Sequence, residues 1–114
     1  MYIKDIYETV TMTEPCPQPK FLSYLDTTVR SLIAKYGIRR VINDEAYIKP
    51  RDINGDIAVK EEFAGAVASN ILYLITKNPD YKTNYVAEAE YAYLTIWREA
   101  MRGKKIVGSD YLRK

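Results

Sequence analysis

Hydrophobic residues recur at helical spacing near the start of the chain, in two stretches that end at residues unfavourable to a helix. The first stretch runs from Ile3 to about Met12 and ends before three closely spaced prolines. The second begins near Pro19, a residue type common in the first turn of a helix, and ends at Gly37. Its apolar side chains form a stripe about 120° wide. The pattern therefore predicts two amphipathic helices that each bury one side.

The second half of the chain predicts two further helices. The third extends from about Asp56, a suitable N-cap, to Lys77, just before an Asn-Pro pair. The fourth extends from about Tyr81 to Arg102 and is followed by Gly103. We therefore expect a mainly α protein, a small four-helix bundle. One side of the third helix carries small residues that would admit another backbone: Ala58, Gly65, Ala66 and Ser69.

The segment between the second and third predicted helices, residues 38–55, lacks helical periodicity. Two short apolar pairs, Val41-Ile42 and Tyr47-Ile48, flank polar residues, and Pro50 and Asn54-Gly55 mark turns. We expect a long central loop or a short hairpin. A connection of this length is unusual in a small helical domain, and long loops often carry function.

The fourth predicted helix has an unusually wide apolar surface. Its apolar side chains spread over roughly 200°, whereas a surface helix in a small monomer needs little more than 100°. The second buried side would face another helix of this chain or a neighbouring subunit. Glu90 lies inside this arc and is expected to need an Arg or Lys partner. The residues expected at a subunit interface are Tyr91, Leu94, Trp97, Met101, Tyr47 and Ile48.

Composition narrows the chemistry open to the protein. The chain has 114 residues, enough for one domain, and contains no histidine and one cysteine, Cys16. It therefore lacks the commonest general base and metal ligand, and it cannot form an intrachain disulfide. The stretch from Asp52 to Asp56 resembles the start of a calcium-binding loop, but Phe63 stands where that loop needs glutamate. We expect no cofactor, no metal and no enzymatic activity.

Charge and hydropathy limit the possible partners. The 17 basic and 15 acidic residues give a formal net charge of +2, too balanced for a protein that mainly coats nucleic acid. The longest apolar run, Ile71 to Ile75, is too short to cross a bilayer, and the N-terminus lacks an apolar signal core, so we expect a soluble intracellular protein. Eleven tyrosines are present, and they either contact a partner or fill half-buried helix flanks.

Basic residues gather near the end of the second predicted helix, at Arg30, Lys35, Arg39 and Arg40. Cations stabilise a helix C-terminus, and they also bind phosphate. If these residues bind phosphate, the protein would be a small helical nucleic-acid-binding regulatory protein. This is the alternative to a role as a structural protein. The positions expected to face phosphate are Arg39, Arg40, Lys49 and Arg51.

The C-terminal residues 104–114 have no core periodicity, yet they carry four apolar side chains. They are either a frayed terminus or a segment that becomes ordered on a partner. We expect a helical domain over residues 1–103 and a docking tail over residues 104–114. The candidate partner-binding residues of this tail are Lys104, Lys105, Ile106, Val107, Tyr111 and Leu112.

The order of these segments resembles a known family. IKDIYETV and FLSYLDTTVRSLIAKYG are followed by VINDEAYIKP, and then by EEFAGAVASNILYLITKNPDYKTNYVAEAEYAYLTIWREAMRG and a short tail. This pattern resembles the head-to-tail connector proteins, also called adaptor or head-completion proteins, of tailed double-stranded-DNA bacteriophages. The resemblance implies a small helical bundle that forms a ring, usually of twelve copies, beneath the portal.

The resemblance also implies partners and a location. The ring would extend the DNA channel and join the head to the tail, through contacts with the portal protein and a tail-side stopper or tail protein. Residues 104–114 would dock on the portal, and residues 41–51 would face a ring neighbour or the channel. DNA would pass without sequence-specific binding, and no membrane would be involved. The protein would be found in the virion neck, and in the host cytoplasm during assembly.

Overall fold

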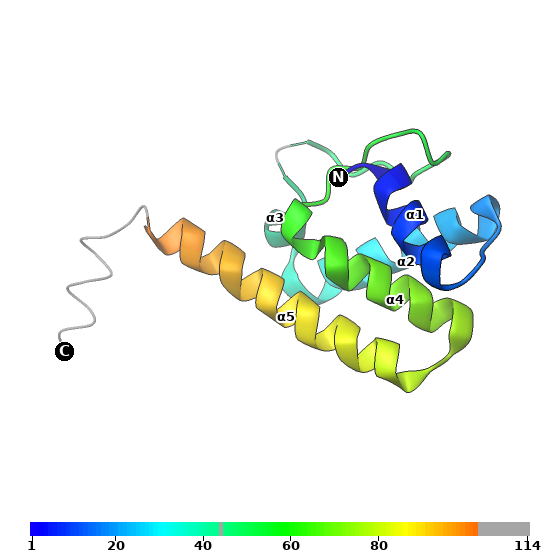
Figure 1. Ribbon diagram of the computed structural model, residues 1–114. Coiled ribbons are helices and arrows are strands. Elements are labelled where there is room, and N and C mark those ends of the chain that lie inside the picture. The colour runs from blue at the N-terminus through cyan, green and yellow to red at the C-terminus, as the bar shows by residue number, and fades with distance from the viewer. Residues whose placement is uncertain (44, 103–114) are drawn as a thin grey trace.

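The structure is a computed structural model that describes residues 1–43 and 45–102 (Figure 1). These residues contain helices and isolated β-bridges, but no strand. The prediction of a mainly α protein is therefore confirmed. The candidate docking tail, from Lys104 to Leu112, lies outside the described residues. The elements are α1 (Ile3–Thr13), α2 (Gln18–Tyr36), α3 (Ile38–Val41), the 3-10 turn η1 (Glu61–Phe63), α4 (Ala64–Thr76) and α5 (Pro79–Arg102).

The first two helices form where the hydrophobic pattern placed them. Helix α1 buries Ile3, Ile6 and Val10 on one side, at the three- and four-residue spacing of a helix. Helix α2 has a proline in its first turn and ends at Gly37, whose φ of 91° is one that residues with a side chain rarely adopt. Gly37 thus ends α2 and lets α3 start in a new direction.

The prediction that the third helix begins at Asp56 is wrong. Residues 57–59 are all buried, and the backbone there pairs with other segments through isolated bridges between Tyr2 and Asp56 and between Ile42 and Val59. The N–H of Lys60 donates to the carbonyl of Val41 over 2.9 Å. These long-range bonds satisfy the backbone groups that a helix would otherwise pair locally. The regular helix therefore starts only at residue 64, after η1, and Ala58 lies outside it.

The central segment was expected to hold no helix, but its first four residues form the short helix α3. The described residues that follow, 42, 43 and 45–60, contain neither a regular element nor a hairpin. Instead, its two ends meet, because Ile42 and Val59 bridge each other and the N–H of Asn43 donates to the carbonyl of Ala58 over 2.9 Å. The long-loop alternative is therefore the one that the structure contains.

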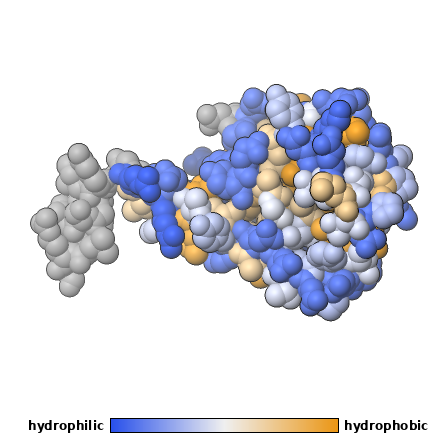
Figure 2. Space-filling view, in the orientation of Figure 1, coloured by the Kyte–Doolittle hydropathy of each residue, from blue (hydrophilic) through white to orange (hydrophobic). Residues whose placement is uncertain are grey.

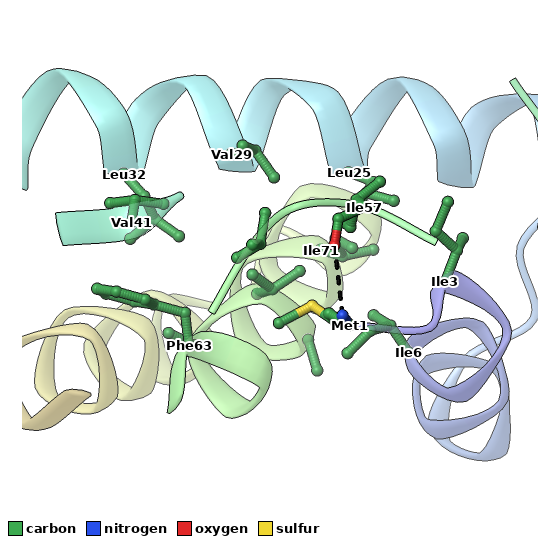
Figure 3. Packing of buried hydrophobic residues seen from close by; sticks show 14 of the residues in the cluster. Met1, Ile3, Ile6, Leu25, Val29, Leu32, Val41, Ile57, Phe63 and Ile71 are labelled. Carbon is green, nitrogen blue, oxygen red and sulfur yellow. Dashed lines mark hydrogen bonds between the residues drawn. The ribbon is translucent and has the colours of Figure 1, made fainter. Parts of the chain in front are cut away.

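The core lies between α1, α2, α4 and residues 57–59, and one side of α5 also contributes to it (Figure 3). Phe21, Leu25, Leu32, Phe63 and Ile71 are fully buried, and each such side chain contributes about 1.5–3 kcal/mol to stability. The α-amino group of Met1 is buried beside this core. It donates to the carbonyl of Ile57 over 3.3 Å, the bond drawn dashed in Figure 3, and pairs with Asp56 at 2.9 Å and Glu61 at 3.1 Å.

Helices α4 and α5 are joined by a short turn and lie side by side as an antiparallel pair (Figure 1). A Cβ atom at Gly65 would lie 2.5 Å from Oε2 of Glu88, and Ser69 hydrogen-bonds to the same carboxylate. The small residues of α4 therefore admit α5 at close range. Helix α5 continues past the start of α4, so its last turns project from the body of the molecule (Figure 1).

Candidate interaction surface

Helix α5 carries a row of large apolar side chains that the protomer leaves exposed. We call the row the α5 strip and define it as Tyr91, Leu94 and Trp97. Val86 is also exposed, but it lies five residues before Tyr91 and therefore on another side of the helix. Tyr91 is 70% exposed and Trp97 is 43% exposed. Leu94 follows Tyr91 by three residues and Trp97 follows Leu94 by three, so consecutive members lie on neighbouring parts of one helix face.

The opposite side of α5 packs on the protomer. Ala89, Ala92 and Ile96 are buried there, and Tyr85 and Tyr93 are half-buried. Helix α5 therefore has one apolar side in the core and another that this protomer leaves exposed. No other helix of the described residues covers the α5 strip, so its burial by a neighbouring subunit stays a prediction. Figure 2 shows hydrophobic residues among hydrophilic ones where α5 leaves the body. Exposed aromatic and aliphatic residues grouped on one surface are typical of an interaction site.

Glu90 lies within the exposed side of α5, but its partner is not the Arg or Lys that we expected. The hydroxyl of Tyr36, on α2, donates to Oε2 of Glu90 over 3.1 Å. Glu90 is exposed, so water solvates the carboxylate and a cation is unnecessary. Burial, together with this hydrogen bond to a carboxylate, raises the pKa of Tyr36 to about 12. The Tyr36 ring also stacks on Tyr93, with the ring centroids 4.9 Å apart.

The two candidate interface residues of the central segment differ in their surroundings. Ile48 is 72% exposed. Tyr47 is half-buried, and its hydroxyl donates to Oδ1 of Asp26 over 2.6 Å. Tyr47 therefore makes its polar contact inside the protomer, whereas Ile48 stays open to a partner. Met101, the last candidate interface residue on α5, is partly exposed.

Asp26 is a buried carboxylate on α2 with two partners. Its second oxygen accepts a 3.0 Å hydrogen bond from Nε of Arg30. Burial by itself would raise the pKa of Asp26, but the bonds from Tyr47 and Arg30 outweigh burial and hold the pKa below its ordinary value. Burial and the bond to Asp26 raise the pKa of Tyr47 above that of a free phenol. The cluster is structural, because its groups are already paired with one another.

The basic residues that we expected to face phosphate lie on α3 and on the central segment. Arg39, Lys49 and Arg51 are exposed, and Arg40 is half-buried. None of the four forms an ion pair with the described residues. The other two members of the basic cluster are engaged: Arg30 pairs with Asp26, and Nζ of Lys35 lies 5.3 Å from the centroid of the Tyr36 ring.

Two features escaped the sequence reasoning. One is the Asp26 cluster, which joins residues 21 positions apart. The other is a hollow of about 630 Å³ at the corner between α4 and α5. Lysines on both sides of the Asn-Pro turn were the available signal for the hollow, but their side chains come to lie over the ring of Tyr73 only after the turn has formed. Its lining residues are Tyr73, Lys77, Pro79, Lys82, Thr83, Val86 and Ala87.

Groups with reactive or metal-binding chemistry are sparse in the part of the chain that the structure describes. No three His, Cys, Asp or Glu side chains gather there in a way that could hold a metal ion. Cys16 is buried, and burial raises the pKa of its thiol. Within the same residues, no helix has the length and apolar character needed to cross a membrane.

Comparison with known proteins finds no matching family model, no matching curated protein and no matching solved structure. The function therefore has to be inferred from the surfaces described above and from the resemblance in sequence pattern.

Proposed function

We propose that this protein is a structural component of a tailed-bacteriophage particle. In this proposal it is a ring-forming adaptor that binds beneath the portal, extends the DNA channel and joins the head to the tail. The observation that supports the assembly role is the α5 strip, which leaves Tyr91, Leu94 and Trp97 exposed on a helix whose other side is already in the core. The phage context comes from the sequence resemblance.

A ring suits a protomer with this kind of surface. In a heterologous, head-to-tail contact, one surface of each copy meets a different surface of the next, and the contacts close into a ring when the rotation permits. Tryptophan and tyrosine contribute most to binding when a partner covers them fully. The α5 strip would supply one surface, and exposed Ile48 on the central segment belongs to a second. The number of copies, twelve by resemblance, belongs to the proposal.

The portal contact is assigned to residues 104–114. They follow directly on α5, whose last turns project from the body (Figure 1). A helical domain of residues 1–103 would then form the ring, and the tail would attach the ring to the portal. On the other side, the ring would receive a stopper or tail protein.

The assembly role is tested by a double variant, Leu94→Ser with Trp97→Ser. Both side chains are exposed, so the protomer should keep its helical circular dichroism spectrum. Electron microscopy of the protein mixed with a portal protein from the same genome should show an added ring for the parent chain and none for the variant. Met12→Ser removes an 87% exposed apolar residue from α1 and serves as the control. Rings of normal occupancy with the double variant would contradict the proposal.

The alternative is a small helical nucleic-acid-binding regulatory protein. It is supported by Arg39, Lys49 and Arg51, which are exposed and form no ion pair with the described residues. This reading predicts a gel-shift complex with duplex DNA at low salt that weakens steeply as salt rises. Loss of that complex with Arg39→Gln and Arg51→Gln, combined with failure to form rings on the portal, would favour the alternative.

A further inference from the structure

The hollow at the α4–α5 corner is a separate surface site. Its volume is about 630 Å³, and much of its lining is apolar: Tyr73 from α4, and Pro79, Val86 and Ala87 from α5. Thr83 also lines it, but its hydroxyl donates to the carbonyl of Pro79 over 3.2 Å and is thus already engaged. The polar side-chain groups left to meet a ligand include the ammonium groups of Lys77 and Lys82 and the hydroxyl of Tyr73.

Lys77 and Lys82 place two positive charges around one aromatic ring. Their Nζ atoms lie 5.7 Å and 5.4 Å from the centroid of Tyr73. Neither lysine forms an ion pair with the described residues. Each ammonium lies within cation–π range of Tyr73. An anionic group bound beside this ring would be attracted by both lysines.

The backbone fixes where the two lysines start. Lys77 ends α4 in the left-handed conformation, with φ at 61°, and its N–H donates to the carbonyl of Tyr73 over 2.7 Å. Lys82 lies in the first turns of α5, after the Asn78-Pro79 turn. The corner therefore holds the stems of both lysines beside the apolar lining. The loss of backbone conformational entropy on binding should thus be small.

We propose that this hollow binds an acidic peptide segment of a partner protein. A carboxylate of the segment would interact with Lys77 and Lys82, and a neighbouring apolar side chain would pack on Val86 and Ala87. Nucleic acid fits less well, because a phosphate backbone offers no apolar side chain to this lining.

This proposal goes beyond the ring and does not depend on it. Lys77 ends α4 and Lys82 lies near the start of α5, whereas Leu94, Trp97 and Met101 lie in the second half of α5. Variants of the hollow can therefore be made without changing those residues of the interface.

The test is a fluorescence-anisotropy titration with a fluorescein-labelled peptide of repeated Leu-Glu-Glu units. The binding variant is Lys77→Asn with Lys82→Gln, since asparagine tolerates the left-handed conformation. The control is Lys4→Gln with Lys20→Gln, which removes two exposed lysines from α1 and α2. We expect the binding variant to weaken the affinity about tenfold or more, which corresponds to about 1.4 kcal/mol. The control should bind like the parent.

A second peptide, with glutamine in place of every glutamate, separates charge from apolar contact. It should bind the parent chain about tenfold more weakly than the acidic peptide. Equal binding of the two peptides, equal binding by the Lys77/Lys82 variant, or no binding of the acidic peptide would overturn the proposal. Duplex DNA that binds through these lysines while the acidic peptide does not would also overturn it, in favour of a nucleic-acid site.

Discussion

The hydroxyl of Tyr47 donates a 2.6 Å hydrogen bond to Oδ1 of Asp26 and thereby ties the central segment to α2. The other oxygen of Asp26 accepts from Arg30, so both oxygens of a buried carboxylate have partners. Because residues 43–60 contain no regular element among those described, a side-chain bond of this kind has more influence on their position than it would inside a helix.

Replacing Tyr47 by phenylalanine should lower stability. The ring would still fill its half-buried place, but Asp26 would lose a hydrogen bond to a charged group, which typically costs about 1–3 kcal/mol. Urea unfolding followed by circular dichroism measures the loss, and amide hydrogen exchange should increase in the central segment. Tyr91→Phe, at a 70% exposed position, is the control and should change stability by less than about 0.5 kcal/mol. Equal effects of the two substitutions would rule out a role for the Tyr47–Asp26 bond.

Asp26 should make stability depend on pH in the acid range. Its pKa is lower in the folded protein than the ordinary value of 3.8, so the unfolded chain binds the proton more readily. The stabilising contribution is complete above that ordinary value and is lost as pH falls through the folded pKa. Urea midpoints measured from pH 6 down to pH 2 should therefore fall less steeply for Asp26→Asn than for the parent. Parallel curves for the two proteins would contradict this prediction.

A buried polar pair joins α2 to α4. Nδ2 of Asn70 donates to Oγ1 of Thr28 over 2.7 Å, and that hydroxyl donates in turn to the carbonyl of Tyr24 over 2.8 Å. Thr28→Val keeps the shape but leaves the Asn70 amide without this acceptor, at a cost of about 1–3 kcal/mol. Thr27→Val, at the exposed neighbouring position, should be nearly neutral. Adding Asn70→Leu to Thr28→Val should recover part of the lost free energy of unfolding, measured with urea. If the second substitution instead lowered this free energy by as much as the first, the two residues would not be coupled.

Gly37 should tolerate no side chain without a conformational penalty. Its φ of 91° and ψ of 147° are nearly restricted to glycine, although a Cβ there would touch nothing within 4 Å. Gly37→Ala should therefore cost about 1–3 kcal/mol purely from backbone strain. At Gly55 the nearest atom to a new Cβ is 3.8 Å away and φ is not positive, so Gly55→Ala should be close to neutral. Coinciding thermal unfolding curves for Gly37→Ala and Gly55→Ala would contradict this prediction.

The sequence predicted α1, α2 and most of α5 well, because helical periodicity and the terminating prolines and glycines act over short range. It also predicted the wide apolar surface of α5, since the angular spread of apolar residues around a helix follows from their spacing alone. Leu94 and Trp97 are exposed on that face. Whether a second copy covers them remains a prediction.

The errors arise where distant segments decide the local structure. Residues 57–59 are compatible with a helix on their own, but their backbone pairs with Met1, Ile42 and Asn43 instead. These long-range bonds keep them out of a helix. The partner of Glu90 was assigned by charge alone, whereas its exposure makes the Tyr36 hydroxyl sufficient. The Asp26–Tyr47 bond and the lysine-lined hollow both require a tertiary arrangement that no spacing rule contains.

The projecting end of α5 has a mechanical consequence. A helix of 24 residues is about 36 Å long, and one of 13 residues, such as α4, is about 20 Å long. The part of α5 after Ile96, its last buried residue, therefore extends beyond the body and can tilt about that residue as a lever arm. A tilt of a few degrees at that point would displace a group joined to Arg102 sideways by a fraction of an ångström to an ångström. Closer packing of Ile96 against its neighbours should therefore reduce this displacement.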